Sequence, residues 1–310
     1  MNTFPCKGIV PPLVTPLTGR DRLDVAALER LIEHVLEGGV HGVFILGTTG
    51  EGPSLSHRLQ REMIRQTGRI VAGRVPVFVG VTDPSFVESV DLARTASEAG
   101  ADFVVLAAPF YFPVHQADLL QYTEEFARES ALPTLLYNMP THTKVSFDIA
   151  TVARLLDNPR IVGVKDSSGS MLYFNQLLEL ARERPDFAVF MGPEELMAQA
   201  VLAGAHGGVC GGANLLPRLY VELFEAAVSD DLRLVAKLQH RVMRMSSKIY
   251  QVGPAPTGYL TGIKSALSLV DICSAIFAEP IHPLSEPQVA TIRQHLVDLG
   301  EFPQLQASKR

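Results

Sequence analysis

Eight short runs of β-branched and apolar residues recur along the first two thirds of the chain, and this pattern constrains the fold most strongly. A longer stretch with helical spacing follows each run. The expected strands contain Ile9 to Val14, Gly42 to Leu46, Val77 to Val81, Phe103 to Ala107, Thr134 to Tyr137, Ile161 to Lys165, Ala188 to Met191 and Gly208 to Cys210. Alternation of apolar strands with helices indicates a parallel sheet, and eight such units favour closure into a barrel over an open sheet. The expected fold class is therefore α/β, a (β/α)₈ TIM barrel.

The segments between these strands have the spacing of amphipathic helices. They include Asp24 to Leu36, Leu55 to Ile70, Ser85 to Glu98, Gln116 to Glu129, Asp148 to Leu156 and Met171 to Glu183. The alternation stops after about Ser229, and residues 232–250, 259–269 and 286–299 are expected to form further helices. No low-complexity linker precedes them. We therefore expect residues 1–229 to form the barrel that carries the active site, and 230–310 to form a C-terminal helical appendage packed on it.

Composition limits the class of partner. Of the 310 residues, 47% are hydrophobic and 19% are charged, which is typical of a globular protein. The net charge of −6 argues against nucleic acid and leaves a small molecule as the expected partner. We expect no membrane contact and a cytoplasmic location, because neither a signal peptide nor an apolar stretch of ~20 residues is present. The three cysteines lack a C-x-x-C pair and the nine histidines lack metal-ligand spacing, so no metal site is expected.

Polar residues at the ends of two expected strands are candidates for chemistry, because TIM barrels carry their active sites at that face. The run G-T-T-G-E at positions 47–51 has hydroxyls beside a tight turn that could hold a carboxylate, although such runs also form ordinary β-to-α turns. Lys165 closes the run I-V-G-V-K at a partly desolvated position. Desolvation disfavours the ammonium, and only a neutral amine attacks a carbonyl to form an imine. The alternative for Lys165 is a solvated side chain at the end of a strand.

Three motifs together carry a family resemblance. They are G-T-T-G-E at 47–51, Y-N-x-P at 137–140 and V-G-V-K-D-S at 162–167. Their order and spacing resemble those of the dihydrodipicolinate synthase/N-acetylneuraminate lyase family, the class I pyruvate-dependent aldolases. The resemblance covers the whole barrel and implies a Schiff base between Lys165 and pyruvate or another 2-keto acid, with no further cofactor.

The resemblance also implies roles for other residues. Tyr137 would move protons during imine formation, and Gly47, Thr48 and Thr49 would bind the pyruvate carboxylate. In the synthase branch the first threonine also links the strand tyrosine to a second tyrosine from a neighbouring subunit. Tyr111 matches that second tyrosine, which implies a homo-oligomer, expected to be a dimer of dimers.

The resemblance leaves the second substrate open. His142 lies where the synthase branch has an arginine for the aldehyde's carboxylate, and a neutral imidazole cannot replace that paired contact. The run G-P-E-E at 192–195 is similar to the segment with which N-acetylneuraminate lyases hold hydroxyls, although acidic residues also favour a helix start. Gly192, Glu194 and Glu195 are therefore expected to bind substrate.

Three further residues lie at or beside substrate positions of the sugar-acid lyases, and one of them departs from the pattern. Ser167 matches a hydroxyl position, whereas Gly211 replaces another hydroxyl, and Val209 lies beside it in an open loop. We therefore expect a lyase that acts on a 2-keto-3-deoxy sugar acid or a related hydroxy-keto acid formed from a keto acid and an aldehyde. The alternatives are 4-hydroxy-tetrahydrodipicolinate (dihydrodipicolinate) synthase, and a non-catalytic keto-acid-binding protein, against which Lys165, Tyr137 and Tyr111 argue.

Overall fold

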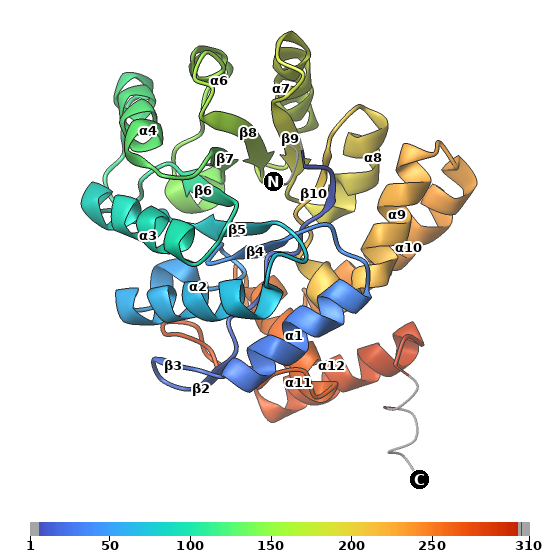
Figure 1. The fold of residues 1–310 in the computed structure, drawn as a ribbon. Helices are drawn as coiled ribbons and strands as arrows, with labels where there is room; N and C mark the ends of the chain where they lie inside the picture. The colour runs from blue at the N-terminus through green and yellow to red at the C-terminus, as the bar shows by residue number, and fades with distance from the viewer. Residues whose placement is uncertain (1–5, 303–304, 306–310) are drawn as a thin grey trace.

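The computed structural model describes residues 6–302 and 305, and it contains one eight-stranded parallel sheet that curls into a barrel (Figure 1). The strands, in spatial order, are β1 (Gly8–Ile9), β10 (Gly207–Gly208), β9 (Ala188–Met191), β8 (Ile161–Asp166), β7 (Thr134–Asn138), β6 (Phe103–Ala107), β5 (Val77–Gly80) and β4 (Val43–Ile45). The predicted (β/α)₈ barrel is confirmed.

The barrel closes through a short segment after β1. The Leu13 amide donates to the Phe44 carbonyl at 2.8 Å, and the Phe44 amide donates to the Pro11 carbonyl at 3.0 Å. The first strand is shorter than the predicted Ile9 to Val14, since Pro11 and Pro12 have no amide hydrogen to donate to a ladder. The last strand ends at Gly208 because the chain enters a 3₁₀ turn at Gly211–Asn214, so the predicted strand from Gly208 to Cys210 is also corrected.

Helices surround the sheet (Figure 1). They are α1 (Val25–Glu37), α2 (His57–Val71), α3 (Phe86–Glu98), α4 (Gln116–Glu129), α6 (Ile149–Leu155), α7 (Met171–Glu183), α8 (Met197–Leu202) and α9 (Pro217–Val228). A short helix, α5 (Pro140–Thr143), follows β7. Capping explains several starts, because Asp24 accepts from the Ala27 amide and Ser56 accepts from the Leu59 amide. A hairpin of β2 (Leu17–Gly19) and β3 (Arg22–Leu23) was not predicted.

Three more helices follow α9. They are α10 (Leu232–Ile249), α11 (Gly258–Leu269) and α12 (Glu286–Leu299), and all three helices predicted after Ser229 are confirmed within one residue. Among the described residues, no helix combines the length and apolar character needed to cross a membrane.

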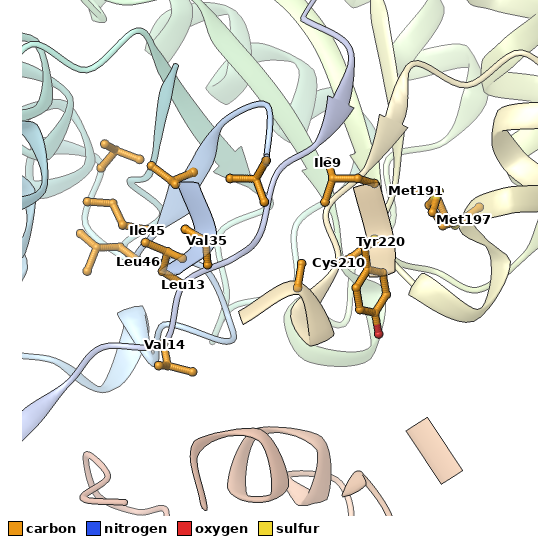
Figure 2. Packing of buried hydrophobic residues seen from close by; sticks show 14 of the residues in the cluster. Ile9, Leu13, Val14, Val35, Ile45, Leu46, Met191, Met197, Cys210 and Tyr220 are labelled. Atoms are coloured by element: carbon orange, nitrogen blue, oxygen red, sulfur yellow. The ribbon is translucent and has the colours of Figure 1, made fainter. Parts of the chain in front are cut away.

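The core has two parts. The larger part lies between the sheet and its helices, where Ile9, Leu13, Val35 and Ile45 pack together (Figure 2). The smaller part fills the barrel interior and includes Phe78 and Phe103, whose rings stack 4.8 Å apart. This filled interior leaves the carboxyl ends of the strands as the place for a site.

Candidate active site

Lys165 and Tyr137 lie opposite each other at the carboxyl ends of β8 and β7. The two residues are partners in the parallel register, and both are buried. The Lys165 Nζ lies 3.8 Å from the centre of the Tyr137 ring and 5.2 Å from that of Phe44. The barrel therefore brings an amine and a phenol together in a largely apolar setting.

A polar clamp holds the ends of these two strands in register. Asn138 and Asp166 are also register partners, and the Asn138 amide donates to Asp166 Oδ1 at 2.8 Å. The Ser168 hydroxyl donates to the other Asp166 oxygen at 2.9 Å. Burial raises the pKa of Asp166, and the bonds from Asn138 and Ser168 oppose that rise. The clamp fixes the residues immediately after Tyr137 and Lys165.

The turn after β4 brings Thr48 to the tyrosine. The hydroxyls of Thr48 and Tyr137 lie 3.1 Å apart, within hydrogen-bonding distance. Gly52 closes the turn, where a Cβ atom would lie 2.1 Å from the Leu46 carbonyl oxygen. The sequence expectation that the G-T-T-G-E run forms a tight turn beside the chemistry agrees with this geometry.

A cavity of about 230 Å³ gathers most of the residues expected to bind substrate. Its lining includes Thr48, Thr49, Tyr137, Lys165, Ser167, Gly192, Glu194, Glu195, Val209 and Gly211. Sequence reasoning missed Tyr250, Tyr259 and Ile263, which line the same cavity from the C-terminal helices. Both tyrosines stand at the ends of predicted helices, but no sequence spacing indicates that they face the barrel.

A second cavity of about 240 Å³ shares Thr48, Tyr137 and Met139 with the first and contains Gly47 and His142. Most of its other lining side chains are apolar, among them Phe44 and Phe110. Burial lowers the pKa of His142, and the positive charges of Lys144 and Lys165 lower it further, so the imidazole is neutral at pH 7. Within the described chain, Lys165 is the only lysine or arginine that lines either cavity.

Glu194 is occupied by internal hydrogen bonds. Its Oε1 accepts from the hydroxyls of Tyr220 and Tyr250, both at 2.5 Å, and its Oε2 accepts from the Gly212 amide at 2.7 Å. Burial, reinforced by Glu195, raises the pKa of Glu194 to about 7. Glu194 lines the cavity, as expected of a residue that binds substrate hydroxyls, but these three internal hydrogen bonds already use most of its accepting capacity. Glu195 is only half-buried and accepts from Ser246.

Tyr111 lines neither cavity of its own chain, although the adjacent Phe110 lines the second one. Its side chain is 85% exposed, its φ is +86°, and its ring contacts that of Phe112 edge-on at 5.0 Å. A bulky residue with positive φ is a backbone outlier. The Tyr111 side chain therefore projects from the surface of its own chain.

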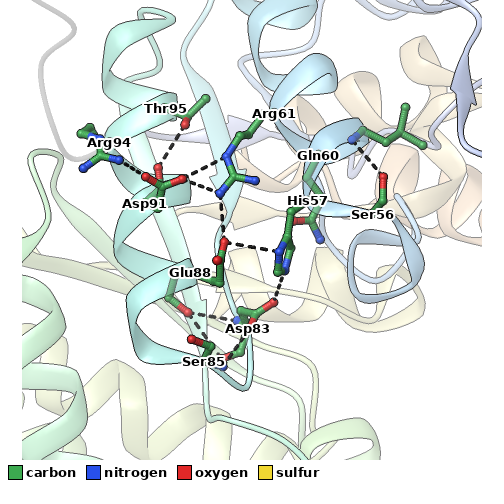
Figure 3. A network of polar contacts seen from close by, with 12 residues as sticks. Ser56, His57, Gln60, Arg61, Asp83, Ser85, Glu88, Asp91, Arg94 and Thr95 are labelled. Atoms are coloured by element: carbon green, nitrogen blue, oxygen red, sulfur yellow. Dashed lines mark hydrogen bonds and ion pairs between the residues drawn. The ribbon is translucent and has the colours of Figure 1, made fainter.

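A charged network lies outside the cavities, between α2 and α3 (Figure 3). His57 approaches Asp83 at 2.8 Å and Glu88 at 3.3 Å, while Arg61 bonds to Glu88 at 2.9 Å and also pairs with Asp91. None of these residues lines the two cavities. In the described part of the chain, no group of three or more histidine, cysteine or acidic side chains is arranged to hold a metal ion.

The chain is similar to one family over nearly its whole length. The model of the dihydrodipicolinate synthetase family matches residues 5–298. A 4-hydroxy-tetrahydrodipicolinate synthase of Gluconacetobacter diazotrophicus is 31% identical over 301 residues, which cover 97% of this chain and 99% of the relative. The synthase of Acidiphilium cryptum is 32% identical and covers 94% and 98% of the two chains.

Solved structures agree with this similarity. A dihydrodipicolinate synthase from Bacteroides thetaiotaomicron is 50% identical, with a TM-score of 0.93 over 96% of this chain and 100% of the other. A prophage protein of the dihydrodipicolinic acid synthase family from E. coli K12, solved in complex with pyruvate, is 30% identical, with a TM-score of 0.89 over 95% of this chain and 98% of the other.

Proposed function

We propose that this chain, which belongs to the dihydrodipicolinate synthetase family, uses Lys165 to form the Schiff base through which it acts on pyruvate. The predicted family is confirmed, and the chain is a lyase with a Schiff-base mechanism. The alternative of a non-catalytic binding protein is therefore set aside. One observation carries the proposal, namely that Lys165, Tyr137 and Thr48 meet at one cavity.

The reaction follows from these positions. The Lys165 amine attacks the keto carbon of pyruvate, and water leaves as a C=N bond replaces the C=O bond. Loss of a proton from C3 gives an enamine, whose carbon attacks the aldehyde carbon while the aldehyde oxygen takes up a proton. Hydrolysis of the imine releases Lys165, and cleavage follows the same steps in reverse. Tyr137 moves the protons, and Thr48 orients its hydroxyl. Gly47, Thr48 and Thr49 bind the pyruvate carboxylate.

Borohydride reduction tests the proposal. Treatment of the enzyme with pyruvate and borohydride should add one reduced pyruvyl group, detected by intact mass and located on Lys165 by peptide mapping. The matched control is Lys144→Ala, since Lys144 lies near the site but lines neither cavity. Labelling that persists in Lys165→Ala would reject the assignment.

We propose an uncharged, hydroxylated aldehyde as the second substrate, so that the product is a 2-keto-3-deoxy sugar acid or a related hydroxy-keto acid. The absence of a lining arginine or lysine other than Lys165, among the described residues, supports this choice, as does the lowered pKa of His142. A carboxylate on the aldehyde would lose its hydration shell on entering the cavity without gaining a cationic partner. Ser167 and Glu195 supply a hydroxyl and a carboxylate for the substrate's hydroxyl groups.

The second candidate is 4-hydroxy-tetrahydrodipicolinate synthase. The names of the curated relatives favour this activity over the sugar-acid reaction. The two candidates differ in the aldehyde, which is aspartate semialdehyde for the synthase. A comparison of kcat/KM for aspartate semialdehyde with that for a panel of neutral sugar aldehydes, each with pyruvate, decides between them.

We also propose that Tyr111 enters the site of a neighbouring copy in a homo-oligomer. Its exposure and its absence from the lining of both cavities of its own chain support this role.

A further inference from the structure

Glu51 and Lys264 form a buried ion pair that the proposed reaction does not use. The Lys264 ammonium donates to Glu51 Oε1 at 2.6 Å, and both side chains are fully buried. The other oxygen, Glu51 Oε2, accepts from the Ala278 amide at 2.6 Å. Neither side chain lines either cavity, so the pair does not contact substrate.

The pair joins two segments that both reach the cavity. Glu51 is the last residue of the 47–51 turn, three positions after Thr48. Lys264 lies on α11, which also directs Tyr259 and Ile263 into the cavity. The partners are 213 positions apart in the sequence, so the contact ties the turn to the C-terminal appendage.

The turn needs external support because its backbone is strained. Leu46 and Glu51 have φ values of +59° and +58°, although neither is glycine. Such conformations persist only where the surrounding structure enforces them. Two donors from the C-terminal segment, Lys264 and the Ala278 amide, hold the Glu51 carboxylate in place.

Because the ion pair is buried, its stability depends strongly on the geometry of the contact. Burial lowers the pKa of Lys264, while the charge and the hydrogen bond of Glu51 raise that pKa. A buried charge must keep its partner, although the pair as a whole adds little to stability compared with well-packed apolar residues. The centre of the Phe277 ring lies 4.9 Å from Lys264 Nζ, so the ring packs beside the ion pair.

We propose that Glu51 and Lys264 are positioning residues that hold the 47–51 turn in the conformation in which Thr48 and Thr49 bind the substrate carboxylate. This rests on the proposed function, which assigns that carboxylate to the turn. It also implies that the barrel at 1–229 does not complete the site without residues 230–310.

Pyruvate titration of imine formation tests the proposal on the full chain. The variants are Lys264→Met, and the double variant Glu51→Gln with Lys264→Met, which buries no charge. In the double variant the glutamine oxygen can still accept from the Ala278 amide and no buried charge is left unpaired, so we expect it to fold even where the single variant fails to fold. Both variants should raise the pyruvate concentration that gives half-maximal borohydride labelling of Lys165 by about tenfold or more, since a displacement of ~1 Å costs up to about a hundredfold. Maximal labelling should stay unchanged.

Leu296→Ala is the matched control, because Leu296 is fully buried on α12 and lines neither cavity. It should lower the melting temperature without changing the half-maximal pyruvate concentration. A folded double variant with the wild-type pyruvate dependence would overturn the positioning role. Failure of the proposed function gives a different result, namely no labelling of Lys165 in the wild-type protein.

Discussion

Tyr137 and Lys165 are paired across neighbouring parallel strands, with the lysine Nζ 3.8 Å from the centre of the tyrosine ring. The register alone creates this pairing, and the hydrogen bond between Asn138 and Asp166 maintains it one position further along. An amine and a phenol are therefore held together before any substrate binds, and such preorganisation is what acid and base catalysis requires.

The first prediction concerns the Tyr137 hydroxyl. Tyr137→Phe should lower kcat by roughly a hundredfold to ten-thousandfold, the usual contribution of one general acid or base. The KM for pyruvate should change little, because the ring and the 47–51 turn remain. Steady-state kinetics measures both, and Tyr122→Phe, on α4 and outside both cavities, is the matched control. An unchanged kcat in Tyr137→Phe would remove the tyrosine from the mechanism.

The second prediction concerns the pH dependence of stability at Glu194. Burial raises its pKa from 4.5 to about 7, so the folded protein holds the proton more tightly than the unfolded chain. The contribution to stability is complete below pH 4.5 and is lost as the pH rises to about 7, a change of about 3 kcal/mol.

Glu194→Gln should remove this slope and make the variant more stable, relative to wild type, at pH 8 than at pH 5. The glutamine oxygen can accept from the Gly212 amide while its amide group donates to the Tyr220 and Tyr250 hydroxyls, which can rotate. Urea unfolding of both proteins across this pH range measures the difference. Parallel stability curves would contradict the raised pKa.

The third prediction concerns His142 and the second substrate. His142→Arg introduces a cation into a cavity whose described lining contains no lysine or arginine. Charge-assisted hydrogen bonds contribute ~1.5 to 3 kcal/mol each, so kcat/KM for aspartate semialdehyde should rise by roughly tenfold to a hundredfold. Values for neutral sugar aldehydes should not rise. Efficient use of aspartate semialdehyde by the wild type, unchanged in the variant, would identify the synthase instead.

The fourth prediction concerns Tyr111. If it serves a neighbouring copy, specific activity should fall on dilution in parallel with dissociation measured by sedimentation. Tyr111→Phe should lower kcat without changing the association, because the ring contact with Phe112 is kept. Phe112→Tyr, at a neighbouring exposed position, is the control for a local change of surface. A fully active monomer would reject the shared site.

The sequence by itself determined the barrel and most of its helices. Alternating apolar runs encode strands through side-chain burial, and Asp24 and Ser56 mark helix starts through capping. The order of the three motifs was enough to predict the family. Strand ends such as Lys165 could be proposed as site residues because a parallel barrel brings all its carboxyl ends to one face.

Only the tertiary structure decided which polar groups already have partners. Glu194 is occupied by Tyr220 and Tyr250, which follow it by 26 and 56 residues, and Glu51 is paired with Lys264 across 213 residues. The periodicity of apolar residues in the sequence predicts whether a residue is buried. It does not predict which distant group forms hydrogen bonds with that residue. That pairing depends on how the helices after Ser229 pack against the barrel, and the same packing brings Tyr259 and Ile263 into the cavity.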